Sequence, residues 1–502
     1  MKKYILILLV ATALFGSSCT DFLSVNEVNP NTASKVTPKL VLPTTLSGIV
    51  STMNNPRRFD FVYLWHGLWS ISAGYSQPQS LVQYKLINSD YQNAFNELYL
   101  VGNNLDAIEK SSTDAKDVYY LAMAKIMKAY VFQTLVDCWG NVPYSEAFKT
   151  SQDILKPKYD DQKTIYEDLV VKIDEAINLI KNAPADANAV PAASDIMYAG
   201  NMTKWMKFAN TLKLRILVQQ SGMTGRTTYI KEKIATTASV GYMGEGDGAL
   251  VNPGYLVSAG KMNPFYAYFY NAAGSSNSDG VTYYMAGKDI VTFLSSTNDP
   301  RLGKFFKPYT GTSYGGNIFG TAAASLTPFA STSQLGYVKD DATTMIGTAT
   351  KASPLFTDFE ALFLQAEAVA KGLITTGSAQ ALYESAVKQS FVYMGLTAAQ
   401  AATYVAQPNS KVNFTVATTP TELIITQKWA ALNGIAPLTI WSDYRRSGYP
   451  AGLNFSPDVN KLGATPPVRL LYPQTELSVN NEQVIAVGDI NSFTSKIFWQ
   501  NR

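Results

Sequence analysis

The segment Asp114–Ala147 reads as one long helix whose surface is apolar around most of its circumference. Its apolar residues recur at spacings of three or four, which places them on one helical face that a second apolar row widens. The two rows are Tyr120, Ala124, Met127, Val131, Leu135 and Cys138, and Phe132, Val136 and Trp139. Asp114 is the predicted N-cap, and Gly140 and Pro143 predict a defined end. A helix buried this broadly needs neighbours on several sides, so the segment predicts a stack of helices.

Helical periodicity recurs before and after this segment, with short connections between the predicted helices. The predicted helices cover Leu40–Met53, Asn88–Lys110, Thr164–Lys181, Met202–Gln220, Thr357–Lys371, Ala379–Met394, a start at Thr397 and the stretch Thr419–Gly434, and the spacing of Phe61, Trp65 and Trp69 is also helical. Such pairing predicts a mainly α, tetratricopeptide-like scaffold with few short strands, although the repeat consensus is absent. Between residues 238 and 353 the periodicity disappears, and we expect long loops with short strands there.

The chain carries few charges for its size, and this argues against nucleic acid as its partner. Of its 502 residues 16% are charged and 46% are hydrophobic, and the net charge is +3. Nucleic-acid binding needs clustered Lys and Arg to neutralise phosphates, and the sequence contains no long basic block. Aromatic residues make up 12% of the chain. So many aromatic rings with so little charge suit a surface that stacks on neutral ligands.

The N-terminus resembles a lipoprotein signal. Lys2 and Lys3 precede a short apolar region, and small residues lead up to Cys19. We expect cleavage after residue 18, acylation of the Cys19 thiol as an anchor in outer-membrane lipid, and a polar tether over residues 19–38. Gly16 stands where the usual lipobox has an aliphatic residue, and an ordinary secretory signal is the alternative. Cys138 is then a free thiol in the long helix, with a disulfide to Cys19 as the alternative.

The sequence offers little for catalysis. His66 is the only histidine, which excludes a His-rich zinc site. Gly311–Gly315 matches the G-x-S-x-G nucleophile pattern, but no apolar strand precedes it and no helix follows. There is no P-loop, and no carboxylate pair stands out for a glycosidase, which needs only two positioned acids. We therefore predict no catalytic residue, no metal ligand and no cofactor.

Short motifs follow one another across nearly the whole chain. They are Cys19–Leu23, Asp137–Ala147, Trp205–Arg215, Asp299–Leu302, Asp358–Ala368, Gln427–Leu432, Trp441–Pro450 and Pro467–Glu476. In this ordered combination the chain resembles the SusD/RagB family of outer-membrane nutrient-binding lipoproteins from Bacteroidetes, nearer the branch called SusD-like 2. No single motif is decisive, and the combination carries the resemblance.

The resemblance implies a single SusD-like domain over residues 39–502, with residues 238–353 as a loop-rich region on the ligand side. It also implies a surface-exposed lipoprotein that caps a SusC-like TonB-dependent barrel as a hinged lid and hands it an oligosaccharide, or sometimes a peptide, without catalysis. A purely structural lipoprotein and a glycosidase are the other hypotheses. The arginines of the shared motifs should make buried or capping contacts: Arg215, Arg301, Arg445 and Arg469.

Ligand sites of the family lie in variable loops, so no motif transfers binding residues to this chain. Sugar binding needs flat aromatic faces for C–H stacking, and amide or carboxyl groups for the hydroxyls. On that basis the candidate ligand-binding residues are Trp65, Trp69, Tyr75, Gln77, Tyr266, Tyr270, Asn271 and Tyr314. Core packing or contact with the barrel is the competing explanation for each of them.

Overall fold

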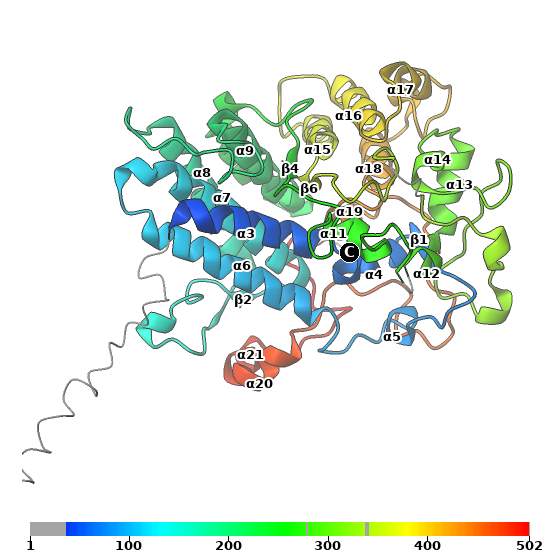
Figure 1. Ribbon diagram of the computed structural model, residues 1–502, viewed down its shortest axis with the longest axis horizontal. Coiled ribbons are helices and arrows are strands. Elements are labelled where there is room, and N and C mark those ends of the chain that lie inside the picture. Colours follow the sequence, from blue (N-terminus) through cyan, green and yellow to red (C-terminus); the bar gives the residue numbers. More distant parts are fainter. Residues whose placement is uncertain (1–36, 278–279, 337–340, 501–502) are drawn as a thin grey trace, which may run out of the picture.

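The structure is a computed structural model that describes residues 37–277, 280–336 and 341–500. The predicted signal peptide, Cys19 and most of the predicted tether lie outside the described residues. The fold is mainly helical, and helices that are neighbours in the chain pack against one another (Figure 1). The packed helices are α3 (Pro38–Met53), α6 (Gln92–Ser111), α7 (Val118–Trp139), α8 (Gln162–Lys181), α9 (Met202–Gln219), α15 (Asp358–Ala370), α16 (Ala379–Tyr393), α17 (Ala398–Val405), α18 (Pro420–Ala431) and α19 (Pro437–Ser447). The predicted helical scaffold is confirmed.

Helix α7 lies at the centre of the first half of the stack, in contact with α3, α6, α8 and α9. Eighteen of its 22 residues are buried, which agrees with the apolar pattern around its circumference. Asp114 caps a short 3-10 turn (Ala115–Asp117) rather than α7 itself, which begins at Val118. Cys138 is a buried free cysteine. The sequence thus placed this helix correctly, apart from its first turn.

The end of α7 is fixed by two buried arginines from the C-terminal part of the chain. The last carbonyl groups of a helix have no partner inside it and need donors from elsewhere. Arg445 Nη1 donates to the Asp137 carbonyl at 2.8 Å, and Arg469 Nη2 donates to the Trp139 carbonyl. Gly140, with φ of 75°, turns the chain away at this point. The predicted capping role of these arginines is confirmed.

A network of buried charges fastens α15 to α19. Arg446 Nη2 lies 2.9 Å from Glu367 Oε2 and 2.8 Å from Asp443 Oδ1. Lys428 of α18 adds an ion pair to Asp443 at 2.9 Å, and Lys371 adds one to Glu367 at 3.1 Å. All but Lys371 are almost fully buried, so removing one partner leaves an uncompensated charge in the interior.

The strands are short and tie distant segments together as three antiparallel pairs. The pairs are β1 (Trp69–Ile71) with β5 (Tyr284–Ala286), β2 (Val142–Pro143) with β3 (Tyr159–Asp160), and β4 (Ala249–Val251) with β6 (Ser353–Phe356). The helical spacing predicted through Trp69 is wrong, because α4 (Pro56–Trp65) ends at Trp65 and Gly67 turns the chain with φ of 69°. Trp69 lies in β1 instead.

The loop-rich region has more helix than the sequence indicated. It contains α11 (Pro264–Phe269), α12 (Gly280–Tyr283), α13 (Lys288–Ser296) and α14 (Leu302–Phe305) among its loops and strands. Shorter helices elsewhere are α5 (Gln79–Val82), α10 (Thr227–Ala235), α20 (Gln474–Val479) and α21 (Asn481–Val487). Helix α6 starts at Gln92 rather than at the predicted Asn88, and α19 lies in a segment for which no helix was predicted.

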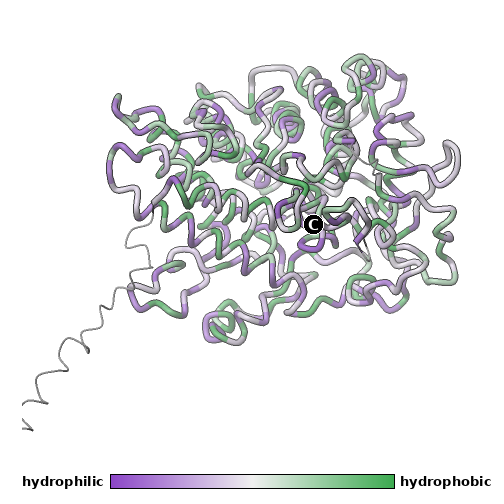
Figure 2. Tube along the Cα trace, in the orientation of Figure 1, coloured by the Kyte–Doolittle hydropathy of each residue, from purple (hydrophilic) through white to green (hydrophobic). Residues whose placement is uncertain are grey.

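Hydrophobic residues alternate with polar ones along the packed helices (Figure 2). Within residues 37–277, 280–336 and 341–500, no helix combines the length and the apolar character needed to cross a bilayer.

Candidate functional site

Four side chains from separate places in the chain meet beside α4 and α11. Arg57 is the second residue of α4, Tyr75 follows β1, Tyr268 lies in α11 and Tyr283 lies in α12. The Arg57 guanidinium carbon is 5.0 Å from the ring centroid of Tyr283 and 5.7 Å from that of Tyr268. Tyr75 meets the Tyr283 ring edge-on, with 5.3 Å between their centroids. Arg57 is exposed and the three tyrosines are half-buried, and we call these four residues the tyrosine surface.

The position of Arg57 is set by the start of α4. The Asn55 side chain accepts the Arg57 backbone N–H as an N-cap, and Pro56 fixes the first helical residue. The helix dipole disfavours a cation in this first turn. Arg58 is compensated there by Glu97, with 2.8 Å between Nε and Oε2, whereas Arg57 lies against tyrosine rings. Partial burial would lower the pKa of Arg57, but the tyrosines and the nearby Asp60 carboxylate outweigh it and raise this pKa, so the exposed guanidinium is held as a cation that is available for binding.

A polar hollow of about 250 Å³ adjoins the tyrosine surface, and Arg57 belongs to both. It is lined by Arg57, Arg58, Asp60, Pro78, Ser80, Leu81, Ser89, Asp90, Tyr91, Gln92 and Asn93. Burial raises the pKa of Asp60, although the hydroxyls of Tyr284 and Tyr91 donate to its carboxylate at 2.6 and 2.9 Å. Gln92 Oε1 is buried and has no partner among the described residues. A hydroxyl donor of a ligand would satisfy that oxygen.

A second, uncharged cavity of about 320 Å³ lies at Tyr266. It is lined by Val257, Tyr266, Ala272, Ala273, Gly274, Thr348, Ala349 and Thr350, none of which carries a formal charge. Tyr270, Asn271 and Ala273 belong to the same loop: Tyr270 is buried against Tyr266, and the Asn271 side chain accepts the Ala273 backbone N–H at 3.0 Å. Asn271 therefore closes the turn that forms one wall of the cavity, and Tyr266 supplies its aromatic face.

Three other candidates from the sequence, Trp65, Trp69 and Gln77, hold the fold together. Trp65 and Trp69 are 1% and 0% exposed, and their indole N–H groups donate to the Leu81 carbonyl and to Asn433 Oδ1. Both rings are core residues, without a free face for stacking. Gln77 Oε1 accepts the Gly320 backbone N–H at 2.9 Å, and Gln77 Nε2 donates to the Thr321 carbonyl at 2.6 Å. Both ends of its amide are therefore bonded to backbone.

The last two of the eight candidates, Tyr75 and Tyr314, are half-buried rather than part of the core. Tyr75 lies on the tyrosine surface, where its hydroxyl is 2.7 Å from Thr282 Oγ1, and its binding role stays a prediction. Tyr314 is half-buried, and a Cβ added to Gly303 in α14 would meet its hydroxyl at 3.1 Å. The sequence reasoning missed Arg57, Tyr268 and Tyr283 as binding candidates. The signal for Arg57 was an arginine pair placed directly before an aromatic run.

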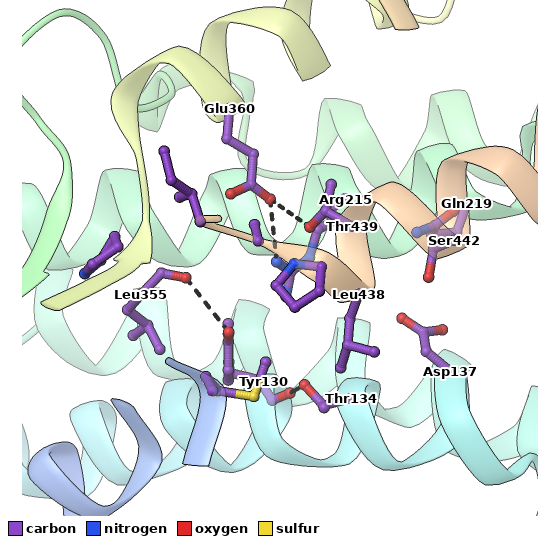
Figure 3. A pocket seen from close by; sticks show the side chains of 15 residues that line it. Tyr130, Thr134, Asp137, Arg215, Gln219, Leu355, Glu360, Leu438, Thr439 and Ser442 are labelled. Atoms are coloured by element: carbon purple, nitrogen blue, oxygen red, sulfur yellow. Dashed lines mark hydrogen bonds and ion pairs between the residues drawn. The ribbon is translucent and has the colours of Figure 1, made fainter. Parts of the chain in front are cut away.

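A narrow interior pocket between α7, α9 and α15 gathers Tyr130, Arg215, Glu360, Asp137 and Thr439 (Figure 3). Thr439 Oγ1 donates to Glu360 Oε1 at 2.8 Å, and Arg215 Nη1 is 3.7 Å from the same oxygen. Burial raises the pKa of Asp137 to about 6. The free volume is only about 30 Å³, which has room for a water molecule but not for a sugar ring. Arg215 is paired with the buried Glu360. This is the buried contact predicted for Arg215, and it stabilises the scaffold.

Within the described part of the chain, no group of three or more His, Cys, Asp or Glu side chains could hold a metal ion.

Comparisons with known proteins assign the chain to a family. The model of the SusD-like_2 family, described as starch-binding and associating with the outer membrane, matches residues 30–473. A solved chitin-binding protein shares 23% identity over 93% of this chain and 100% of its own, with a TM-score of 0.76. A SusD homologue from Bacteroides uniformis shares 24% over 92% and 99%, with a TM-score of 0.73.

A chitin-binding SusD homologue from Flavobacterium johnsoniae has the same fold, at 21% identity over 91% and 98% of the chains and a TM-score of 0.73. No curated protein sequence matches the chain. Identities this low establish the fold only, whereas the family match extends across most of the sequence. The predicted membership is therefore confirmed: the chain belongs to the SusD-like_2 family of starch-binding proteins that associate with the outer membrane.

Proposed function

We propose that this protein captures an oligosaccharide at the cell surface and delivers it to a SusC-like TonB-dependent transporter in the outer membrane. The observation that carries the proposal is the tyrosine surface beside the polar hollow. Three partly exposed tyrosine rings offer faces for the C–H groups of a sugar. The hollow next to them offers a guanidinium, carboxylates and amides for its hydroxyl groups. One ligand spanning both would use both kinds of contact.

The domain arrangement proposed from the sequence fits this surface. We place the signal peptide at residues 1–18, the lipid anchor at Cys19, a tether to residue 38, and one binding unit over residues 39–502. Tyr268 and Tyr283 come from the loop-rich region at 238–353, which supports its assignment to the ligand side. Arg57 and Tyr75 come from outside it, so the proposed site joins the region to the helical scaffold.

A peptide ligand is the second candidate, and Arg57 is the observation that favours it. A guanidinium binds a carboxylate through two parallel hydrogen bonds, which suits a peptide C-terminus or an acidic side chain. Binding of that kind weakens with added salt because the charges are screened. Binding of a neutral glycan at the tyrosine surface should be nearly insensitive to salt. Titrations at low and high ionic strength therefore separate the two candidates.

The binding proposal is tested by calorimetry of the wild type and three variants against a panel of glycans and peptides. We expect Tyr283→Ala and Arg57→Ala to weaken binding of the recognised ligand at least tenfold, because truncation of a hot-spot residue at the centre of a site costs about 2 kcal/mol or more. Tyr309→Ala is the matched control, because Tyr309 is a 39% exposed tyrosine of the same loop-rich region outside the site. Equal affinity for all four proteins would refute the assignment of the site.

Anchoring and partner are tested separately. Metabolic labelling with a fatty-acid probe should mark the wild type and fail to mark Cys19→Ser. Affinity purification of the tagged protein from outer membranes should recover a TonB-dependent barrel. An eluate without a barrel, under conditions that keep other outer-membrane complexes intact, would contradict the transporter part of the proposal and leave the binding part standing.

A further inference from the structure

A further cavity lies away from the tyrosine surface. It has a volume of about 550 Å³ and lies between α13, α18 and the loop 450–454. That volume is within the range of about 300–1,000 Å³ typical of small-molecule sites. None of its lining residues belongs to the tyrosine surface or to the polar hollow. Helices α13 and α18 lie in the same half of the molecule in Figure 1.

Two largely buried aromatic rings, Phe293 at 9% and Trp429 at 3% exposure, line the base of this cavity. Phe293 of α13 and Trp429 of α18 meet edge-to-face, with 5.7 Å between their ring centroids. The Trp429 indole N–H donates to the His66 carbonyl at 3.1 Å, which fixes the orientation of the indole. Two rings held by packing and a hydrogen bond are preorganised, so a ligand that contacts them has little side-chain entropy to freeze.

The walls are rich in hydroxyl groups. Thr292, Ser296, Ser410, Thr418, Thr419 and Thr426 all line the cavity. Thr419 holds the N-cap position of α18, yet its side chain does not cap the helix. Each hydroxyl can donate one hydrogen bond and accept two, which matches the hydroxyls of a sugar in both directions.

The charged residues that line the cavity are balanced in sign, and one of them, Asp289, also holds part of the wall in place. Lys288, Lys411, Asp289 and Glu422 all line the cavity, so the formal charge of its lining is zero. The Asp289 carboxylate accepts the Asn454 backbone N–H at 3.0 Å and also the Asn454 side-chain amide. This contact ties the loop 450–454 to α13. A balanced lining gives no net attraction to an anion or a cation and suits a neutral ligand.

We propose that this cavity is a second binding site, which takes one to two units of a neutral saccharide independently of the tyrosine surface. The exposed parts of the two rings contact C–H groups of the sugar, and the hydroxyl and charged side chains of the walls form hydrogen bonds with its hydroxyl groups. Two separate sites on one chain would hold a polymeric glycan at two places and raise the effective concentration of each site for the other.

The test is calorimetric titration of the mature chain with maltose, cellobiose and N,N′-diacetylchitobiose at millimolar concentration. Thr292→Tyr fills the cavity from an exposed position of α13, and Ser295→Tyr adds the same bulk to an exposed neighbour outside the lining. We expect at least one disaccharide to bind wild type and Ser295→Tyr at the cavity. Thr292→Tyr should lose that binding at least tenfold, and Tyr283→Ala should keep it.

Three results would overturn the inference: identical titrations for Thr292→Tyr and Ser295→Tyr, loss of all binding in Tyr283→Ala, or no binding of any of the three disaccharides. Binding lost only in Tyr283→Ala would refute the second site while leaving the proposed function intact. Binding lost only in Thr292→Tyr would support the second site and contradict the proposed role of the tyrosine surface.

Discussion

Replacement of Glu367 by Gln should destabilise the folded protein strongly, because Glu367 neutralises Arg446 in the interior. Both side chains are 1% exposed. The amide of Gln carries no charge and presents an N–H₂ group toward a guanidinium that has only donors. Asp443 is then the one carboxylate left in an ion pair with Arg446, and it is shared with Lys428. Breaking a buried pair in this way costs about 3–5 kcal/mol of unfolding free energy.

The pKa of Glu367 gives a second, independent expectation. Burial by itself would raise this pKa, but Arg446 and Lys371 overcome it and lower the pKa from 4.5 to about 2. The unfolded chain therefore binds a proton more readily than the folded one between these values. The stabilisation is complete above pH 4.5 and is lost as the pH falls toward 2. The interval between the two pKa values corresponds to about 3 kcal/mol.

Urea unfolding followed by circular dichroism, at pH 7 and at intervals from pH 5 to pH 3, measures both effects. Glu482→Gln is the matched control, since Glu482 is also a helical glutamate paired with a lysine but is 74% exposed. It should change the unfolding free energy by less than about 1 kcal/mol. The reasoning fails if Glu367→Gln costs no more than Glu482→Gln at pH 7. It also fails if wild type and Glu367→Gln lose stability in parallel as the solution is acidified.

Three further predictions concern the scaffold. Gly140→Ala should lower the free energy of unfolding, measured in urea, by about 1–3 kcal/mol more than Gly225→Ala does. Both glycines have φ of 75°, but a Cβ at Gly140 meets Arg469 at 3.0 Å, whereas one at Gly225 meets open space. Arg301→Lys should cost about 3 kcal/mol in the same assay, because lysine cannot keep both the two-pronged contact with buried Asp299 and the bond to Gln427. A cost below 1 kcal/mol would contradict this. Burial raises the pKa of the Cys138 thiol, so a thiol reagent should label Cys138 only after denaturation, as read by peptide mass spectrometry; rapid labelling of the native protein would refute the burial.

The sequence predicted the scaffold far better than the candidate site. Helix α7 and its end at Gly140 follow from periodicity and turn residues that lie next to each other in the chain. The binding candidates did not follow, because a run of aromatic residues looks the same whether its rings face the core or the solvent. Trp65 and Trp69 became core, while Tyr75, six residues after Trp69, lies on the tyrosine surface.

By itself the sequence determined the helical class, the family and the absence of a nucleic-acid signature, since periodicity, ordered motifs and charge are properties of the chain. Tertiary structure alone decided what meets at the tyrosine surface and in the large cavity. Arg57 and Tyr283 are brought together by folding, as are Phe293 and Trp429. Contacts between residues so far apart depend on how helices and strands pack in three dimensions, and no local pattern encodes them. The capping of α7 by Arg445 and Arg469 depends on both sequence and tertiary structure. The last carbonyl groups of any helix need donors, which the local sequence predicts, but these donors come from a part of the chain that only folding brings close.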